Sequence, residues 1–158
     1  MNSSCSKTVG KREMDLKAKR NLKQDLQAKL ERTTSQLGEL NHELAEQMIT
    51  LAAQTNDTAP LIQAVDALNK AKTYYKIETA PKEALIVQCS LADTLLKLGQ
   101  KNQDKAALES SLEAYRRAIT LASLVGDESR RQDMKINYKL AQTLTGRHKK
   151  TISLFKVA

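Results

Sequence analysis

A short sequence motif occurs three times along this chain. Each copy reads Leu-Ala, then two variable residues, then a large apolar residue: LAEQM from Leu44, LADTL from Leu91 and LAQTL from Leu140. The starts of the copies are 47 and 49 residues apart. A period of roughly 20–50 residues is typical of chains built from stacked supersecondary units. The repeat therefore constrains the fold more strongly than any other feature of the sequence.

A second motif follows each copy of the first. It consists of a small residue, a large residue four positions later and, three positions after that, an alanine. Its copies are Ala64, Leu68 and Ala71; Ser111, Tyr115 and Ala118; and Thr151, Phe155 and Ala158. It starts 20 residues after the Leu-Ala motif in the first two copies and 11 residues after it in the third. The equal offset in two separate places indicates one repeated unit.

The two motifs together resemble the signature of the tetratricopeptide repeat family. That signature has Leu-small-x-x-large on helix A and Ala-x-x-x-aromatic-x-x-Ala on helix B. LADTLLKLG and SLEAYRRAITL resemble one consensus unit, and TGRHKKTISLFKVA resembles the end of another. The resemblance covers about residues 37–158, or roughly three units. The family's period is about 34 residues, whereas the period here is 47, with the excess between helices A and B.

The resemblance implies antiparallel helix pairs that stack into a short right-handed superhelix. Stacking is required because one pair cannot bury its apolar face alone. Small residues of the first motif would allow close helix approach, and large residues of the second would insert between pairs. The expected packing residues are Leu44, Ala45, Leu68, Leu91, Ala92, Tyr115, Leu140, Ala141 and Phe155. A simple helical bundle with Leu–Ala packing is the alternative.

Composition and periodicity independently predict an all-α fold. The chain has only five Gly and two Pro, which disfavours a many-turned β sandwich or barrel. Pro60 can open a helix, Thr79 can cap the helix that starts in the ETAP turn, and Gly99, Gly126 and Gly146 are expected to end helices. We expect helices over residues 13–54, 61–77, from the ETAP turn to 99, 105–125, 127–145 and 148–158.

The chain is expected to have three parts. Residues 1–12 are predicted to be a disordered tail, residues 13–36 a basic helical extension and residues 37–158 the repeat domain. Within the long first helix, leucines recur every seven residues: Leu30, Leu37, Leu44 and Leu51, with Leu26 and Leu40 at alternate core positions. This seam of leucines does not favour a coiled coil, because polar residues occupy the remaining seam positions of the heptad pattern. They are Lys19, Lys23, Thr33 and Gln47.

Charge is distributed unevenly along the chain. The formal net charge is +8, with +5 in residues 1–32, −4 in residues 33–115 and +7 from residue 116 to the end. The chain therefore has two basic ends around an acidic middle. Opposite signs could attract within one molecule, or between the end of one molecule and the middle of another.

Several classes of protein and of site are disfavoured by what the sequence lacks. It has no apolar run long enough for a transmembrane helix and no secretory signal segment. Cys5 and Cys89 are too few for a disulfide framework, and His42 and His148 are isolated. No phosphate-binding glycine loop, catalytic triad or metal motif is present. We expect a soluble, cytoplasmic protein that is not an enzyme and needs no cofactor or metal.

The expected function is reversible binding of a segment of another protein. By resemblance to the family, the A helices line a concave groove. The residues expected there are Glu39, His42, Glu46, Cys89, Asp93, Lys135, Tyr138 and Gln142. The groove would grade from acidic to basic. It lacks the Lys and Asn with which some family members hold a terminal carboxylate, so chaperone-tail binding of that kind is not expected.

Two alternatives come from other classes of protein. The basic ends could contact nucleic-acid phosphates through Arg131, Lys135 and Lys139 on one helical face and through the run at 147–150. No aromatic platform for bases accompanies them, so a solvated basic face is the simpler interpretation. The chain could also self-assemble through its last helix, where Leu154 and Phe155 would be covered by another subunit or by the N-terminal helix.

Overall fold

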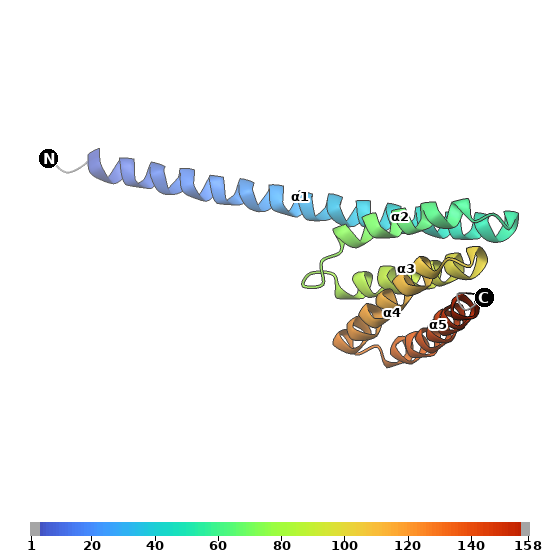
Figure 1. Cartoon of the computed structure of the whole chain (residues 1–158). Helices are drawn as coiled ribbons and strands as arrows, with labels where there is room; N and C mark the ends of the chain where they lie inside the picture. Colours follow the sequence, from blue (N-terminus) through green and yellow to red (C-terminus); the bar gives the residue numbers. More distant parts are fainter. Residues whose placement is uncertain (1–3, 156–158) are drawn as a thin grey trace. The chain divides into compact units, whose positions relative to one another are not determined.

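The computed structural model describes the backbone of residues 4–155 and the side chains of residues 13–146. This part of the chain contains helices and no strands, which confirms the all-α prediction. The helices are α1 (Ser4–Thr55), α2 (Ala59–Tyr74), α3 (Pro81–Asn102), α4 (Lys105–Val125) and α5 (Glu128–Phe155), as Figure 1 shows. Short connections separate them, so that consecutive helices from α2 onward pack on one another.

The contacts divide the chain into two compact units, Met1–Gln36 and Leu37–Ala158. In the first unit α1 begins at Ser4, so the backbone of residues 4–12, which we expected to be disordered, is helical. This segment has no Pro and a single Gly, so no residue in it prevents helix formation. From Glu13 to Gln36 the side chains are exposed except Thr34, which is half-buried.

In the second unit, α1 packs through small residues and not through its leucines. Gly38, Ala45 and Ala52 are buried at seven-residue intervals, and Ala45 packs among the alanines and Leu68 of α2. Leu44, an expected packing residue, is 46% exposed. The prediction that Leu44 packs between helices is therefore wrong. The same prediction is confirmed for its neighbour Ala45. A face of small side chains allows the backbones of neighbouring helices to approach closely.

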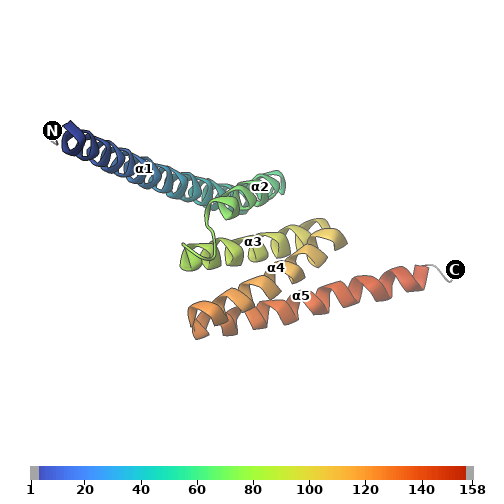
Figure 2. The ribbon, with the colours of Figure 1, turned by 90° about the vertical axis from the view of Figure 1, so that its left-hand side faces the viewer.

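Helix α3 lies in the middle of the second unit, with α2 on one side and α4 on the other (Figure 2). Leu91 packs in the cluster shared with α1 and α2, and Ala92 packs in the cluster shared with α4 and α5. Both residues are buried because α3 is covered on two sides. Leu68, Tyr115 and Ala141 are also buried, with no side-chain exposure.

Helix α5 differs from the prediction in two respects. Leu140 was expected to pack between helices but is 46% exposed, because within the described residues α5 packs on α4 and α3 through another face. Gly146 was expected to end the helix, yet the backbone continues in helical form to Phe155. A glycine without positive φ costs a helix only about 1 kcal/mol. Leu154, the expected packing residue Phe155 and the basic run at 147–150 lie outside the described side chains.

The ends of the middle helices are set by proline, aspartate and glycine. Pro60 and Pro81 lie in the first turns of α2 and α3. The predicted cap Thr79 is wrong, since Ala80 holds the N-cap position and makes no side-chain cap. The Asp104 carboxylate caps α4 by accepting hydrogen bonds from two backbone N–H groups, at 2.8 and 3.3 Å. Gly126 ends α4 with a φ of 77°, a left-handed conformation that favours glycine.

Gly99 has a different role from the predicted one. Helix α3 continues past it to Asn102, and Gln103 takes the left-handed C-cap position. Gly99 is buried, and a Cβ placed on it would lie 2.7 Å from Cγ and 2.9 Å from the backbone N of Leu108. The absent side chain therefore allows the start of α4 to pack directly against α3.

Candidate functional site

The residues predicted to line a groove lie on α1, α3 and α5. Their side-chain contacts connect them in separate small sets and not in one groove. Nε2 of His42 lies 3.3 Å from the Ser90 hydroxyl, which connects α1 with α3. Nε2 of His42 also lies 3.8 Å from a carboxylate oxygen of Glu46. Glu39 and Glu46 are exposed. This part of the predicted groove is a polar surface next to a contact between two helices.

Asp93 is the centre of a second set, which joins three helices. Its Oδ1 accepts a hydrogen bond of 2.6 Å from the Tyr115 hydroxyl of α4 and one of 3.1 Å from Nδ2 of Asn137 of α5. Burial, followed by the hydrogen bond to Asp93, raises the pKa of Tyr115 well above its ordinary value. Tyr115 therefore stays protonated and donates to Asp93. This arrangement indicates a structural role for Asp93.

Tyr138 forms a third set with residues of α4 and α5. Its hydroxyl accepts hydrogen bonds from Nε of Arg116 at 3.1 Å and from Nε2 of Gln142 at 3.3 Å. The Arg116 guanidinium carbon also lies 5.7 Å from the centre of the Tyr138 ring. Within the same helix, Lys135 is half-buried. These contacts hold Tyr138 beside α4.

The remaining groove candidate, Cys89, is half-buried between two apolar clusters. Burial raises the pKa of its thiol to about 11, while Arg130 acts in the opposite direction. At neutral pH the sulfur is therefore the neutral thiol, which is a weak nucleophile and a weak metal ligand. The packing role expected for a small apolar residue accounts for this environment.

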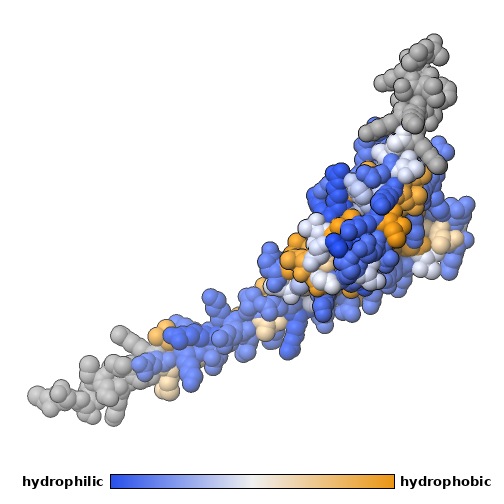
Figure 3. All heavy atoms as spheres, turned by 90° about the horizontal axis from the view of Figure 1, so that it is seen from below, coloured by the Kyte–Doolittle hydropathy of each residue, from blue (hydrophilic) through white to orange (hydrophobic). Residues whose placement is uncertain are grey.

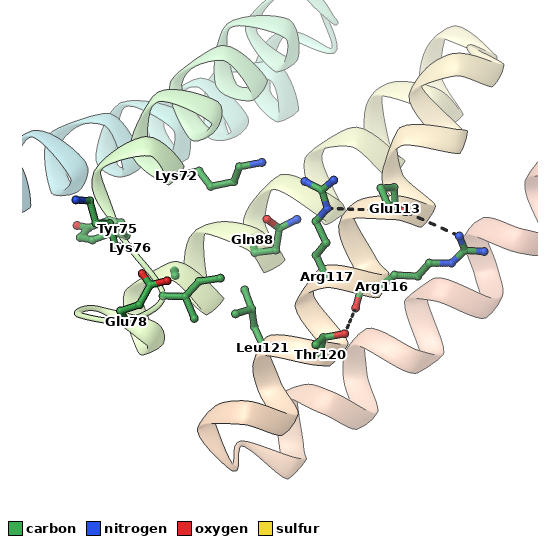
Figure 4. A pocket seen from close by; sticks show the side chains of 12 residues that line it. Lys72, Tyr75, Lys76, Glu78, Gln88, Glu113, Arg116, Arg117, Thr120 and Leu121 are labelled. Carbon is green, nitrogen blue, oxygen red and sulfur yellow. Dashed lines mark hydrogen bonds and ion pairs between the residues drawn. The ribbon is translucent and has the colours of Figure 1, made fainter.

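A cleft of about 580 Å³ lies between α2 and α4, and residues of α3 also line it. Ala84 of α3 and Leu121 of α4 are apolar lining residues, and both are buried. Lys72 from α2 and Arg117 from α4 extend into the space between the two helices (Figure 4). The cleft therefore combines an apolar floor with cationic side chains on two sides.

The charged groups of the cleft give it a net positive charge. Its lining includes four basic and two acidic side chains: Lys72, Lys76, Arg116, Arg117, Glu78 and Glu113. Glu113 accepts a hydrogen bond of 3.1 Å from Nε of Arg117 and lies 3.8 Å from a terminal nitrogen of Arg116. Glu113 is thus paired with both arginines of the α4 wall. The lysines come from the opposite wall.

Contacts beneath the cleft fix its shape. Gln88 is 3% exposed, and its Nε2 donates a hydrogen bond of 3.1 Å to the carbonyl of Ala114, which joins α3 to α4. On the α2 side, the ring of Tyr75 lies against Gly38, where an added Cβ would approach the ring to 2.6 Å. Burial, followed by Glu39 and Glu83, raises the pKa of the Tyr75 hydroxyl.

Sequence reasoning missed this cleft because its walls come from distant segments. We expected the second helix to extend to residue 77, whereas α2 ends at Tyr74 and the following residues form a loop that lines the cleft. The available signal was the pair Lys72 and Lys76 at helical spacing, together with Arg116 and Arg117 inside the second motif. Neither pair indicates by itself that the two lie close together.

Among the described residues, no three His, Cys, Asp or Glu side chains are grouped so that they could hold a metal ion. None of the helices described here combines the length and apolar character that crossing a membrane requires. Apolar side chains do reach the surface among hydrophilic ones (Figure 3). On α5, Ile136 and Leu140 are exposed.

Comparison of the chain with protein-family models, curated proteins and solved structures finds no match. The function is therefore argued from the geometry and charge of the cleft.

Proposed function

We propose that this chain is a cytoplasmic, non-enzymatic protein-interaction module that binds an acidic segment of another protein in the cleft between α2 and α4. The observation that carries the proposal is the cleft itself, in which an apolar floor lies between cationic walls. Binding sites of this kind take an apolar anchor into the concavity and use a few polar groups for orientation. Complementary charge would guide the partner to the site.

The proposed complex follows from the positions of four side chains. An apolar side chain of the partner would lie on Ala84 and Leu121 at the floor of the cleft. Carboxylates on either side of this anchor would pair with Lys72 of α2 and Arg117 of α4. Arg117 offers a planar group that can hold a carboxylate by two hydrogen bonds, whereas Lys72 acts as a point charge. The preferred segment is therefore acidic with interspersed apolar residues.

We also propose that the helices form tetratricopeptide-like units, with α1 and α2 in the first, α3 and α4 in the second, and α5 at the start of a third. Support comes from the burial of Ala45, Ala92 and Ala141 at equivalent motif positions. Leu68 and Tyr115, at equivalent positions of the second motif, are also buried. In such an arrangement, the cleft lies between the B helices of the first two units.

A charge-reversal experiment tests the proposed binding site. The probe is a fluorescein-labelled peptide of Glu-Glu-Leu triplets, and its fluorescence anisotropy reports binding to the full chain at low salt. We expect the Lys72→Glu/Arg117→Glu variant to raise the peptide Kd by about tenfold or more, because attraction is replaced by repulsion on both walls.

The matched control is Lys70→Glu/Lys97→Glu, which alters the net charge equally at two exposed lysines outside the cleft lining. This variant should retain most of the affinity at the same ionic strength. Equal losses in the two variants, or no binding by the unmodified chain, would contradict the proposal. Tighter binding of a single-stranded oligonucleotide, falling steeply with salt, would instead favour the nucleic-acid alternative.

A further inference from the structure

Gln88 is a polar side chain at the apolar floor of the cleft. It is only 3% exposed, and it lies one helical turn after Ala84 on α3, so that both residues line the cleft. Leu121 of α4 lines the floor beside them. Buried polar groups in proteins are nearly always hydrogen-bonded, because a buried group without a partner is costly. The hydrogen bonds of the Gln88 amide therefore show what the floor still requires.

The amide of Gln88 is fixed in one orientation. Its Nε2 donates a hydrogen bond of 3.1 Å to the carbonyl of Ala114. A carbonyl oxygen can only accept, so the amide nitrogen must lie on that side and Oε1 on the other. Within the described residues, Oε1 accepts no hydrogen bond, and no fully buried polar side-chain atom lacks a partner. Oε1 is therefore not fully buried and is open to the cleft, into which the Gln88 side chain points (Figure 4).

An open acceptor at the floor restricts what can cover it. A purely apolar side chain placed over Oε1 would remove it from water without offering a donor in exchange, which costs affinity. A cationic donor is disfavoured, because Lys72 and Arg117 lie on the two walls. The preferred anchor is therefore a large apolar side chain with a neutral hydrogen-bond donor.

The indole side chain of tryptophan has this combination. Its ring is large and apolar, and its N–H group donates and cannot accept. A tyrosine hydroxyl would bring an acceptor as well, while Nε2 of Gln88 is already bound to Ala114. The cationic walls favour the same choice, because tryptophan is the aromatic side chain that attracts cations most strongly to its face.

We propose that the anchor of the bound acidic segment is a tryptophan whose indole N–H donates a hydrogen bond to Oε1 of Gln88. This inference rests on the proposed function of the cleft and names the side chain that it recognises. The ring would lie on Ala84 and Leu121, and the flanking carboxylates of the segment would pair with Lys72 and Arg117. Gln88 is then the residue that determines specificity for a donor.

Peptides that differ at one side chain test this inference. The first is the fluorescein-labelled peptide of Glu-Glu-Leu triplets, and the second has tryptophan in place of its central leucine. The third has benzothienylalanine there, which keeps the shape of tryptophan but has sulfur in place of the indole N–H. In fluorescence anisotropy with the full chain, the tryptophan peptide should bind about fivefold or more tightly than the benzothienylalanine peptide, because only the former has the donor.

A Gln88→Met variant tests whether Gln88 is the acceptor. Methionine keeps an unbranched side chain of similar length, so the ratio of the two affinities should fall below about twofold in this variant. Thr120→Val is the matched control, since it alters another polar lining residue whose hydroxyl donates to the carbonyl of Arg116. This control should retain the full ratio. The comparison of peptides on the unmodified chain stands even where Gln88→Met does not fold.

The outcomes separate this inference from the proposed function. Suppose that the Glu-Glu-Leu peptide binds and is weakened by Lys72→Glu/Arg117→Glu, while the tryptophan and benzothienylalanine peptides bind equally well. The tryptophan anchor would then be overturned, and the proposed function would stand. A ratio that persists in a folded Gln88→Met variant would overturn the role of Gln88. Absence of binding by all three peptides would overturn both proposals.

Discussion

Replacement of Tyr115 by Ala is expected to lower the free energy of unfolding by about 3–5 kcal/mol. Tyr115 is completely buried in the cluster shared by α3, α4 and α5, so its loss leaves a cavity between three helices. Asp93 would also lose the hydrogen bond of 2.6 Å that it accepts from the Tyr115 hydroxyl. Urea denaturation followed by far-ultraviolet circular dichroism measures the change. The protein concentration must be equal in all samples, because self-association would add to the measured stability.

Tyr115→Phe separates the ring from the hydroxyl. It keeps the packing volume and removes only the donor, so we expect a smaller loss of about 1–2 kcal/mol. A Tyr115→Ala variant with nearly unchanged stability would contradict the packing described for α4. If Tyr115→Phe were as unstable as Tyr115→Ala, the hydrogen bond to Asp93 would dominate over burial.

Gly99→Ala is expected to lower the free energy of unfolding by about 1–3 kcal/mol, although alanine is the better helix former. The added Cβ would lie 2.9 Å from the backbone nitrogen of Leu108, as well as against its side chain. A flexible side chain could move aside, but the backbone at the start of α4 cannot do so without disturbing the packing. Thermal and urea denaturation of the full chain measure this loss.

Gly146 offers a matched control for the same substitution. It lies inside helix α5, and a Cβ placed on it would meet no atom within 4 Å. Gly146→Ala should therefore leave stability unchanged or raise it by up to about 1 kcal/mol. If the two variants changed stability in the same direction and by the same amount, the close approach of α4 at Gly99 would be refuted.

These two glycines also show why helix ends were only partly predictable. Gly126 was predicted correctly as the end of α4, because its left-handed φ of 77° is the usual reason for glycine at that position. A Cβ added at Gly99 would instead lie against Leu108, and a Cβ added at Gly146 would meet no atom within 4 Å. A sequence shows the same residue in all three cases. Only the neighbouring helix decides which role the glycine has.

The burial expected for Leu44 on α1 was wrong for a related reason. The largest apolar residues of a helix are usually those that face the core, so Leu44 was expected to pack together with Ala45. The buried positions are instead Gly38, Ala45 and Ala52, which recur every seven residues one position further along. This stripe of small residues was visible in the sequence. Its meaning depends on how closely α2 and α3 approach.

The candidate cleft was beyond sequence reasoning because two ordinary helix faces form it. Lys72 and Arg117 are separated by 45 residues, and each alone resembles a solvated cation on a helix surface. The motif positions predicted the core in part, since Ala92, Tyr115 and Ala141 are buried but Leu44 and Leu140 are exposed. They carried no information about the space between α2 and α4. That space depends on the crossing of the two helices over α3.

The most direct test of the central claim is methyl NMR of the full chain during titration with the Glu-Glu-Leu peptide. Binding in the cleft predicts that the largest shift changes occur at Ile77, Ala84 and Leu121, which line it. The methyl groups of Ala45 and Ala141, beside the predicted groove residues of α1 and α5, should change little. Largest changes at Ala45 and Ala141, with Ala84 and Leu121 unaffected, would contradict the account and place binding on the motif helices.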